Sequence, residues 1–451
     1  MIVSRRMLGR AGLFSAALAL LTPLFITGPA YGMKIQDITT PSGIRAWLVE
    51  ERTVPLMAMR FAFEGGNAQD PQGREGVANF VTGMMDEGAG SLDAQAFQKR
   101  MEEIAMRMSF EDGRDRVYGD FQTLTQNRAA AVNLLKLAIN TPRFDPEAMD
   151  RVRAQILSGI AADARNPDKI AGERWTASVF PNHPYGRPSH GTAPSVQAIG
   201  QDDLKAFHRR TFARDTLKVV VVGDISAAEL IPILDDVFGT LPAKAELTPV
   251  ATIVPKATQK LQVIDLAVPQ SVAVFGGPAI DRKDKDYMAA TVLNHILGGG
   301  GFSSRLMEEV REKRGLAYSV YSYLQTLQRS SIFAGGVATK NEEMARSLEV
   351  IRGEFRRMAS EGPTDRELEN AKNNLIGSFA LRFDTNAKIA NNLLFYFTED
   401  FGIDYVDRRN REVAAVGIDD VRRVAKRLFD NDEFFVTVVG RPVGLASDKR
   451  G

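Results

Sequence analysis

The sequence contains an internal repeat, and this repeat limits the possible folds more than any other feature. Residues 199–224 align without gaps onto residues 416–441 at an offset of 217, and 10 of the 26 aligned positions are identical. Both copies predict a helix with aspartates at its start, then a turn, then a buried strand that ends at Gly223 or Gly440. The chain is therefore predicted to hold two copies of one domain.

The segments that open the two halves agree with this interpretation. In each half an apolar run is followed by a turn and an amphipathic run, in residues 55–88 and 270–299. With strands early, helices in the middle and a strand late, the fold class is predicted as α+β. We expect two homologous sandwich domains, with helices packed on a mostly antiparallel sheet, that form a clam-shell.

The predicted domains run from 33 to 247 and from 259 to 451. Residues 248–258 contain Pro249 and Pro255 with little periodicity, so they are predicted to be an extended linker. Most other periodic segments are predicted to be scaffold. The helices are expected at 93–107, 145–164, 341–360, 364–383 and 386–399, and the strands at 115–123 and 330–340.

Residues 1–32 differ from the rest of the chain. Arg5, Arg6 and Arg10 precede an apolar run, and small residues follow near Gly32, which is typical of a bacterial signal peptide. An uncleaved membrane anchor is the alternative, because the apolar run has borderline length for spanning a bilayer. Export by the general or the twin-arginine route stays open. The expected location is periplasmic or secreted.

The composition narrows the class of function. Removing residues 1–32 takes away three arginines and no acidic residue, so the formal net charge falls from +1 to −2. A nearly neutral chain does not indicate binding to nucleic acid or to an anionic membrane surface. The absence of cysteine excludes disulfides and thiolate metal sites.

The stretch 298–320 is the first candidate for a working surface. Gly298, Gly299, Gly300 and Gly301 are expected to allow positive φ and close approach of another chain. A helix is predicted from Ser304 to Arg314, capped by Ser303 or Ser304 and ended by Gly315, and a strand carrying Tyr318 is predicted to follow.

Several motifs together resemble the M16 zinc peptidases, the family of insulinase and of the mitochondrial processing peptidases. They are the duplicated halves, the Gly-rich stretch, REKRGLAYSV at 311–320 and HPYGRPSHGT at 183–192 with the helix that follows. In that family the first helix of the first half carries His-x-x-Glu-His. Its histidines bind zinc, its glutamate is the general base, and a glutamate downstream completes the site.

The zinc-binding residues of this family are missing from the matching positions. Asn79 and Gly83 stand at the two histidine positions and Thr82 at the glutamate position, and Gly159, or its neighbour Ser158, stands at the position of the downstream glutamate. None of these side chains is a good zinc ligand or a base for a metal-bound water. This chain is therefore expected to bind no zinc and no other cofactor.

The four histidines offer no obvious replacement site. His183, His190, His208 and His295 have no metal-ligating partner at chelating spacing, so each is expected to be a surface or hydrogen-bonded structural residue. Asp86 and Glu87 lie near the vacated helix positions and are expected to be solvated.

Arg311 and Tyr318 match an arginine and a tyrosine that act on the substrate in the resembling family. The resemblance implies that the tyrosine O–H donates to the oxyanion on the scissile carbonyl and that the guanidinium binds a neighbouring carbonyl. The resemblance also implies a heterodimer, in which a zinc-bearing M16 paralogue supplies the metal and peptides are the substrate.

Two further interpretations stay open. The chain could be a non-catalytic scaffold or peptide-binding module that keeps the fold. It could also be an independently active peptidase with an unusual metal site.

Overall fold

The internal repeat forms the same helix and strand in both halves. The computed structural model describes residues 33–257, 259–430 and 434–447. In the first copy α7 (Gln201–Thr211) leads to β6 (Lys218–Gly223). In the second copy α14 (Ile418–Phe429) leads to β11 (Phe435–Gly440).

The two helices begin with the same hydrogen bond. The backbone N–H of Gly200 donates to Asp203 Oδ2 at 2.8 Å, and that of Gly417 donates to Asp420 Oδ2 at 3.0 Å. An acidic side chain in the first turn binds an otherwise unpaired donor and also suits the helix dipole. The aspartates predicted at these helix starts therefore have a local role that is kept in both copies.

Each half contains one twisted sheet, and the two sheets have matching strand orders. The first follows β1-β2-β6-β3-β5-β4 and the second β7-β11-β8-β10-β9. All pairings are antiparallel except β2 with β6 and β7 with β11. The remaining strands are β1 (Ile35–Thr39), β2 (Arg45–Glu50), β3 (Leu56–Glu64), β4 (Arg107–Asp112), β5 (Arg116–Leu124), β7 (Leu261–Asp265), β8 (Gln270–Pro278), β9 (Ser319–Leu327) and β10 (Ser330–Lys340). This confirms the predicted α+β class with mostly antiparallel sheets.

Helices cover the sheets, and each half has its own apolar core. One core draws on residues between Ile38 and Leu241 and the other on residues between Ala273 and Val438. The helices of the first half are α1 (Val77–Met84), α2 (Ala94–Glu103), α3 (Arg128–Asn140), α4 (Pro146–Asp163), α5 (Pro167–Val179), α6 (Ala193–Ala198) and α8 (Ala227–Phe238) with α7. Those of the second half are α9 (Tyr287–Asn294), α10 (Met344–Glu361), α11 (Asp365–Gly377), α12 (Asn386–Thr398) and α13 (Tyr405–Ala415) with α14.

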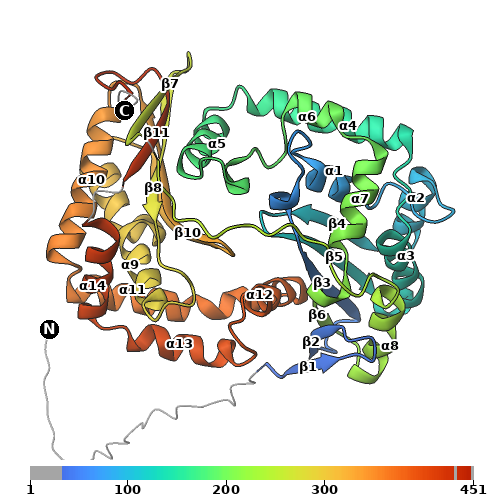
Figure 1. Cartoon of the computed structure of the whole chain (residues 1–451). Coiled ribbons are helices and arrows are strands. Elements are labelled where there is room, and N and C mark those ends of the chain that lie inside the picture. Colours follow the sequence, from blue (N-terminus) through green and yellow to red (C-terminus); the bar gives the residue numbers. More distant parts are fainter. Residues whose placement is uncertain (1–32, 258, 431–433, 448–451) are drawn as a thin grey trace, which may run out of the picture. The chain divides into compact units, whose positions relative to one another are not determined.

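One helix of each half packs on the sheet of the other half. Figure 1 shows α5 of the first half beside β11 and β8 of the second sheet, and α12 of the second half beside β6 and β3 of the first sheet. Trp175 on α5 donates its indole N–H to the carbonyl of Phe435 at 3.0 Å. These helices bury the sheet faces that point away from each half's own core, so β6 after Lys218 and the whole of β11 are buried on both faces instead of alternating. Residues 34–451 thus form one compact unit.

Two predicted helices end earlier than expected. The helix expected at 93–107 stops at Glu103, because Ala105 takes a positive φ of 49° and Arg107 begins β4. The helix expected at 364–383 stops as an α-helix at Gly377 and continues as a 3-10 turn over Phe379–Phe383. The turn puts Phe379 into the buried interior.

Residues 248–257 run without regular secondary structure, and both halves hold them in place. The side-chain amide of Gln69 donates to Thr248 O at 2.9 Å and accepts from the N–H of Thr248 at 2.7 Å. The N–H of Ile253 donates to Arg329 O and that of Lys256 to Val179 O. The remaining residue of the predicted linker, 258, lies outside the described residues, as does the predicted signal segment 1–32. Within the described part of the chain, no helix combines the length and the apolar character that crossing a bilayer requires.

Candidate functional site

Helix α1 carries the positions at which the resembling family binds zinc. It begins after Gly76, whose φ of 99° and close approach to His190 O exclude a side chain. The carboxylate of Asp70 accepts from the N–H groups of Gly76 and Ala78, at 2.7 and 3.0 Å. Burial raises the pKa of Asp70 to about 7, against the effect of these two hydrogen bonds. A buried carboxyl group therefore anchors the start of the helix.

The polar side chains at these positions have partners within the protein. Asn79 Nδ2 donates to Asp112 Oδ1 at 3.0 Å, and Thr82 Oγ1 donates to the carbonyl of Asn79 at 2.9 Å. Gly83 is exposed, and a Cβ there would lie 3.3 Å from Val152 on α4. None of these three positions carries an imidazole or a carboxylate.

The downstream position lies on α4, the helix that packs against α1. Gly159 is exposed with nothing within 4 Å of a built Cβ, and Ser158 is exposed as well. The fold thus keeps the two neighbouring helices that carry the family's ligand positions, without the ligands themselves.

A hydrogen-bonded network adjoins α1, and the sequence analysis did not find it. Asp112 on β4 accepts from Asn67 at 2.8 Å as well as from Asn79. Arg114 donates to Asn67 Oδ1 at 3.3 Å and to the carbonyl of Arg187 at 2.8 Å. These residues come from separate segments, so no local motif in the sequence points to them.

The described residues form no alternative metal site. Within residues 33–257, 259–430 and 434–447, no three His, Asp or Glu side chains lie close enough together to hold a metal ion. His183 accepts from the N–H of Tyr185 through Nδ1 and pairs through Nε2 with Ala251 O at 2.9 Å. His208 pairs with Ile139 O at 2.9 Å, and burial lowers the pKa of His208 to about 4. These contacts confirm the prediction of hydrogen-bonded structural residues for both.

His190 is exposed, whereas His295 is half-buried and begins a π-helical turn, His295–Gly299. Burial lowers the pKa of His295, and its Nε2 has no hydrogen-bond partner. Of the acidic pair, Asp86 accepts from Gln98 and Glu87 pairs with Arg151, so both have partners within the protein.

Three of the four glycines at 298–301 lie against other residues of this chain, which leaves no room for a side chain. A Cβ at Gly298 would lie 2.6 Å from the backbone nitrogen of Ser322 on β9. At Gly299 it would meet Asn294 Nδ2, and at Gly300 the carbonyl of His295, each at 2.6 Å. Gly301 alone of the four has positive φ, 60°, and open space around its Cβ position. The expectation of positive φ at all four positions was therefore wrong for three.

The helix after the glycines is shorter than predicted and of another type. It spans residues 305–312, and Met307–Glu312 form a π-helix. Ser303 and Ser304 do not cap it, because their hydroxyls donate instead to the carbonyls of Gly300 and Gly301. Gly315 follows with φ of 60°, as expected of a helix-ending glycine.

The structure brings Arg311 and Tyr318 into contact and adds an aromatic residue that the sequence analysis missed. The Cζ atom of Arg311 lies 4.9 Å from the ring centroid of Tyr318 and 4.8 Å from that of Phe302, within cation–π range. Tyr318 is 82% exposed and precedes β9 by one residue, so it lies outside the strand that was predicted to carry it.

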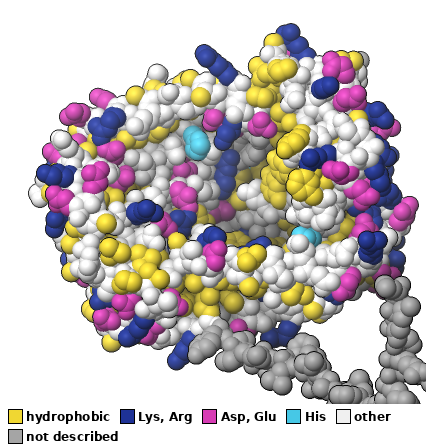
Figure 2. Space-filling view, turned by 180° about the vertical axis from the view of Figure 1, so that it is seen from behind, with side chains coloured by type: hydrophobic (Ala, Val, Ile, Leu, Met, Phe, Trp, Pro, Cys, Tyr) yellow, Lys and Arg dark blue, Asp and Glu magenta, His cyan; other side chains and the backbone are white. Residues whose placement is uncertain are grey.

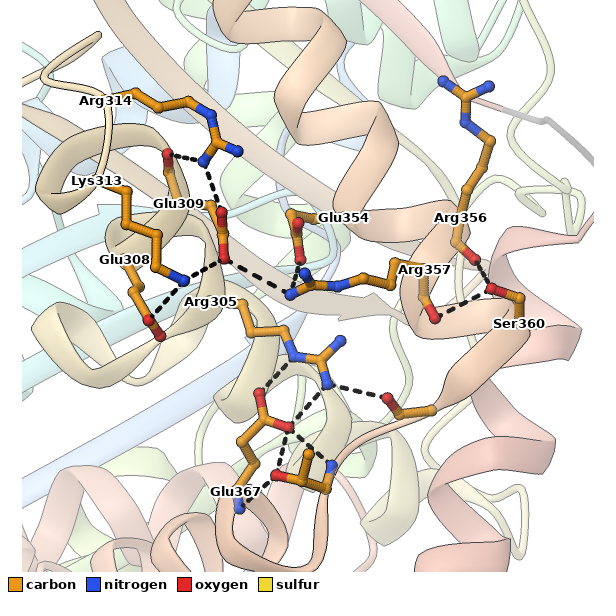
Figure 3. A network of polar contacts seen from close by, with 12 residues as sticks. Arg305, Glu308, Glu309, Lys313, Arg314, Glu354, Arg356, Arg357, Ser360 and Glu367 are labelled. Carbon is orange, nitrogen blue, oxygen red and sulfur yellow. Dashed lines mark hydrogen bonds and ion pairs between the residues drawn. The ribbon is translucent and has the colours of Figure 1, made fainter.

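A buried ion-pair network holds the helix that carries Arg311 (Figure 3). Glu309 is 5% exposed and accepts from Lys313 at 2.8 Å and from Arg314 at 2.6 Å. Burial acts to raise the pKa of Glu309, but the two cations outweigh it and the pKa is lowered. Arg305 is likewise held by Glu367.

Arg311 takes no part in this network. Its only ion pair among the described residues is with the exposed Glu312, at 3.4 Å. The guanidinium is therefore positioned by a fixed helix and two rings without being neutralised by a buried acid.

Exposed aromatic side chains continue from this corner along the edge of the second sheet. We call Phe302, Arg311, Tyr318, Tyr321 and Tyr323 the aromatic edge. Tyr321 and Tyr323 lie on β9, the edge strand, with 50% and 42% of their surface exposed and their ring centroids 6.2 Å apart. Exposed aromatic side chains beside the edge strand of a sheet are typical of a binding surface.

One face of the molecule has a central hollow. Figure 2 shows the unit hollowed near its centre, with acidic and basic side chains around the hollow. Such a hollow offers concave surface on which a peptide could be bound.

Two protein-family models match the chain, and both describe the M16 peptidases. Residues 47–193 match the model described as insulinase (peptidase family M16), and residues 198–375 match the model described as peptidase M16 inactive domain. Together the two matches cover more than two thirds of the chain.

Individual relatives carry different descriptions. A protein of Helicobacter pylori named non-peptidase homolog YmxG is 28% identical over 77% of this chain and 80% of its own length. An uncharacterized zinc protease of Streptomyces coelicolor is 26% identical over 87% of this chain and 86% of its own. A solved structure described as a peptidase M16 inactive domain from Pseudomonas fluorescens has a TM-score of 0.86 and 29% identity, covering 92% of this chain and 99% of that one.

Proposed function

Because the chain belongs to the M16 peptidase family, we propose that it is a subunit without zinc that completes the active site of a zinc-bearing M16 partner for the hydrolysis of peptides. One observation carries this proposal. Arg311 and Tyr318 lie in contact on an exposed surface, although the zinc positions of the same chain hold Asn79, Thr82 and Gly83. The chain keeps a substrate-binding pair but lacks the hydrolytic residues.

The chemistry of the pair suits a peptide carbonyl. The hydroxyl of Tyr318 donates to the oxyanion that develops on the scissile carbonyl, while the zinc of the partner supplies the activated water. The cation–π contacts of Arg311 with two rings use none of its N–H donors, so the guanidinium can still donate to a neighbouring carbonyl. Neither residue hydrolyses a peptide by itself, so the chain is inactive alone.

The aromatic edge provides a surface for the rest of the substrate. The outer edge of β9 offers unpaired backbone groups to an extended peptide, and Tyr321 and Tyr323 offer apolar contacts at alternate positions. Gly301 leaves room for a backbone to approach beside them.

The relatives support parts of this proposal. The name of the Helicobacter pylori protein agrees with loss of peptidase activity, and the Pseudomonas fluorescens structure is described as an inactive domain. We further propose that the chain acts in the periplasm or outside the cell, on the basis of residues 1–32.

The test is reconstitution with a zinc-bearing M16 protein from the same organism. Each protein is assayed alone and in an equimolar mixture, with a quenched fluorescent peptide that has no stable structure. We expect activity in the mixture only. Tyr318→Phe removes one oxyanion donor and should lower kcat by about 10²- to 10³-fold, and Arg311→Ala should raise KM and lower kcat.

Arg346→Ala provides the matched control, because Arg346 is an exposed cation on α10. It should leave the activity of the mixture unchanged. Full activity with Arg311→Ala and Tyr318→Phe would show that the roles are wrongly assigned. A mixture without activity, or activity with a stoichiometric metal in this chain alone, would refute the divided site and favour a scaffold or an independent peptidase.

A further inference from the structure

The second half contains a cavity that the proposed peptidase site does not use. It has a volume of about 220 Å³ and lies between the end of β8, α10 and the end of α14. Phe333, Phe355, Phe429 and Phe434 form an aromatic wall around it, with centroid distances of 5.0 to 5.5 Å between packed pairs. Phe333 and Phe355 are fully buried, so the floor of the cavity is apolar.

The corresponding place in the first half is closed. At the repeat offset of 217, Phe429 corresponds to Phe212 and Phe434 to Leu217. Phe212 and Leu217 are 0% and 3% exposed within the first core, whereas Phe429 and Phe434 are half-buried. The same supersecondary unit thus packs to a solid core in one copy and leaves an aromatic cavity in the other.

Two arginines on α10 line this cavity, Arg352 and Arg356. The Cζ of Arg352 lies 5.4 Å from the ring centroid of Phe434, and its buried Nε has no hydrogen-bond partner among the residues that the structure describes. Figure 3 shows the guanidinium of Arg356 turned away from the ion-pair network around Glu309. Among the ion pairs of residues 33–257, 259–430 and 434–447, none involves either arginine.

A cavity with an aromatic wall on one side and two guanidinium groups without an acidic partner among the described residues suits a ligand that has both an apolar body and an anionic head. Guanidinium binds carboxylate through paired hydrogen bonds, which are strongest where water is excluded. A dry cavity of about 150 Å³ accepts benzene, so 220 Å³ has room for a phenyl ring and a short chain. The volume lies below the range of about 300 to 1,000 Å³ that holds drug-sized ligands.

We propose that this cavity binds a small aromatic monocarboxylate, with its ring against the aromatic wall and its carboxylate on Arg352 and Arg356. Ring and charge should both contribute, because the ring packs on the phenylalanine side chains and the carboxylate binds guanidinium more strongly than a neutral head does. The site is separate from the aromatic edge, so it does not depend on the proposed peptidase role.

Isothermal titration calorimetry of the purified chain with 3-phenylpropionate tests the proposal, with 3-phenylpropanamide and propionate as comparison ligands. The acid should bind saturably at one site. The neutral amide, and propionate without the ring, should each bind at least tenfold more weakly, a difference of about 1.4 kcal/mol.

Variants separate this site from nonspecific binding of anions. Arg352→Gln should weaken binding of 3-phenylpropionate at least tenfold, while Arg346→Gln on the same helix should leave it unchanged. Leu428→Trp, which fills the cavity without altering its charge, should abolish binding. Equal affinity for acid and amide, equal effects of Arg352→Gln and Arg346→Gln, or no saturable binding to the folded wild type would each overturn the proposal.

Discussion

Gly223 and Gly440 show at the scale of a residue why some identities are kept between the two copies of the repeat. Their φ angles are 148° and 142°, in the region that favours glycine. A Cβ at Gly223 would lie 2.1 Å from Leu56 O, and one at Gly440 would lie 2.3 Å from Ser271 Oγ. Strand pairing at the end of β6 and β11 therefore demands glycine in both halves. Gly159 is different, since it lies on the exposed face of α4 with no atom near it.

These two kinds of glycine predict opposite effects of the same substitution. Gly223→Ala should lower the free energy of unfolding by about 2 kcal/mol or more, because the backbone of Leu56 must move. Gly159→Ala should raise it by about 0.5 to 1 kcal/mol, because alanine is the better helix former. Urea denaturation of both variants measures the difference. A stability loss in Gly159→Ala comparable to that in Gly223→Ala would contradict the packing described for these positions.

At the scale of an element, α12 is the clearest case of a helix that belongs to one half and stabilises the other. Phe397 on α12 stacks on Trp47 of the first sheet, with centroids 4.3 Å apart and an interplanar angle of 10°. Arg45 and Lys218, from β2 and β6, lie over the same ring at 5.2 and 5.1 Å. The ring is 3% exposed, while Phe395 on the same helix is 45% exposed.

Phe397→Ala should lower the free energy of unfolding by about 3 to 5 kcal/mol, as expected for loss of a buried aromatic side chain. Phe395→Ala is the matched control on the same helix, and it should cost less than about 1 kcal/mol. Urea unfolding followed by the fluorescence of Trp47 and Trp175 reports both values. Similar costs for the two variants would show that α12 does not pack on the first sheet through this face.

At the scale of the whole molecule, ion pairs join residues of one half to residues at and after the end of α12, the helix from the other half. Arg116 on β5 pairs with Glu64 of its own sheet and with Glu399 at the end of α12, where it also donates to the carbonyl of Thr398 at 2.9 Å. Lys218 pairs with Asp400 at 2.9 Å. Both contacts bury or half-bury a charge with a partner from the other half, so separating the halves would leave charges unpaired.

This interlocking predicts that residues 33–451 unfold in one cooperative transition, although they contain two homologous sheets. Differential scanning calorimetry should give a single peak whose calorimetric and van't Hoff enthalpies agree. Two resolved peaks would show that the halves are stable independently. Arg116→Met should shift the peak to lower temperature, because it leaves Glu399 without this cation.

The sequence by itself determined several features that depend on residues close together in the chain. The repeat, the bounds of β10 and nearly those of α4, and the α+β class all follow from local periodicity and turn residues. The absence of zinc ligands at Asn79, Thr82, Gly83 and Gly159 is likewise a matter of residue identity.

Only the tertiary structure decided the features that depend on residues far apart. Local periodicity carries no information on which sheet α5 or α12 covers, and none on the contact of Asn79 with Asp112 or of Arg311 with Phe302. The wrong caps after Gly301 have a local cause instead, because the hydroxyls of Ser303 and Ser304 donate to carbonyls three residues earlier in the chain. Local sequence sets which elements form, and the packing of distant side chains sets where they lie and what they present.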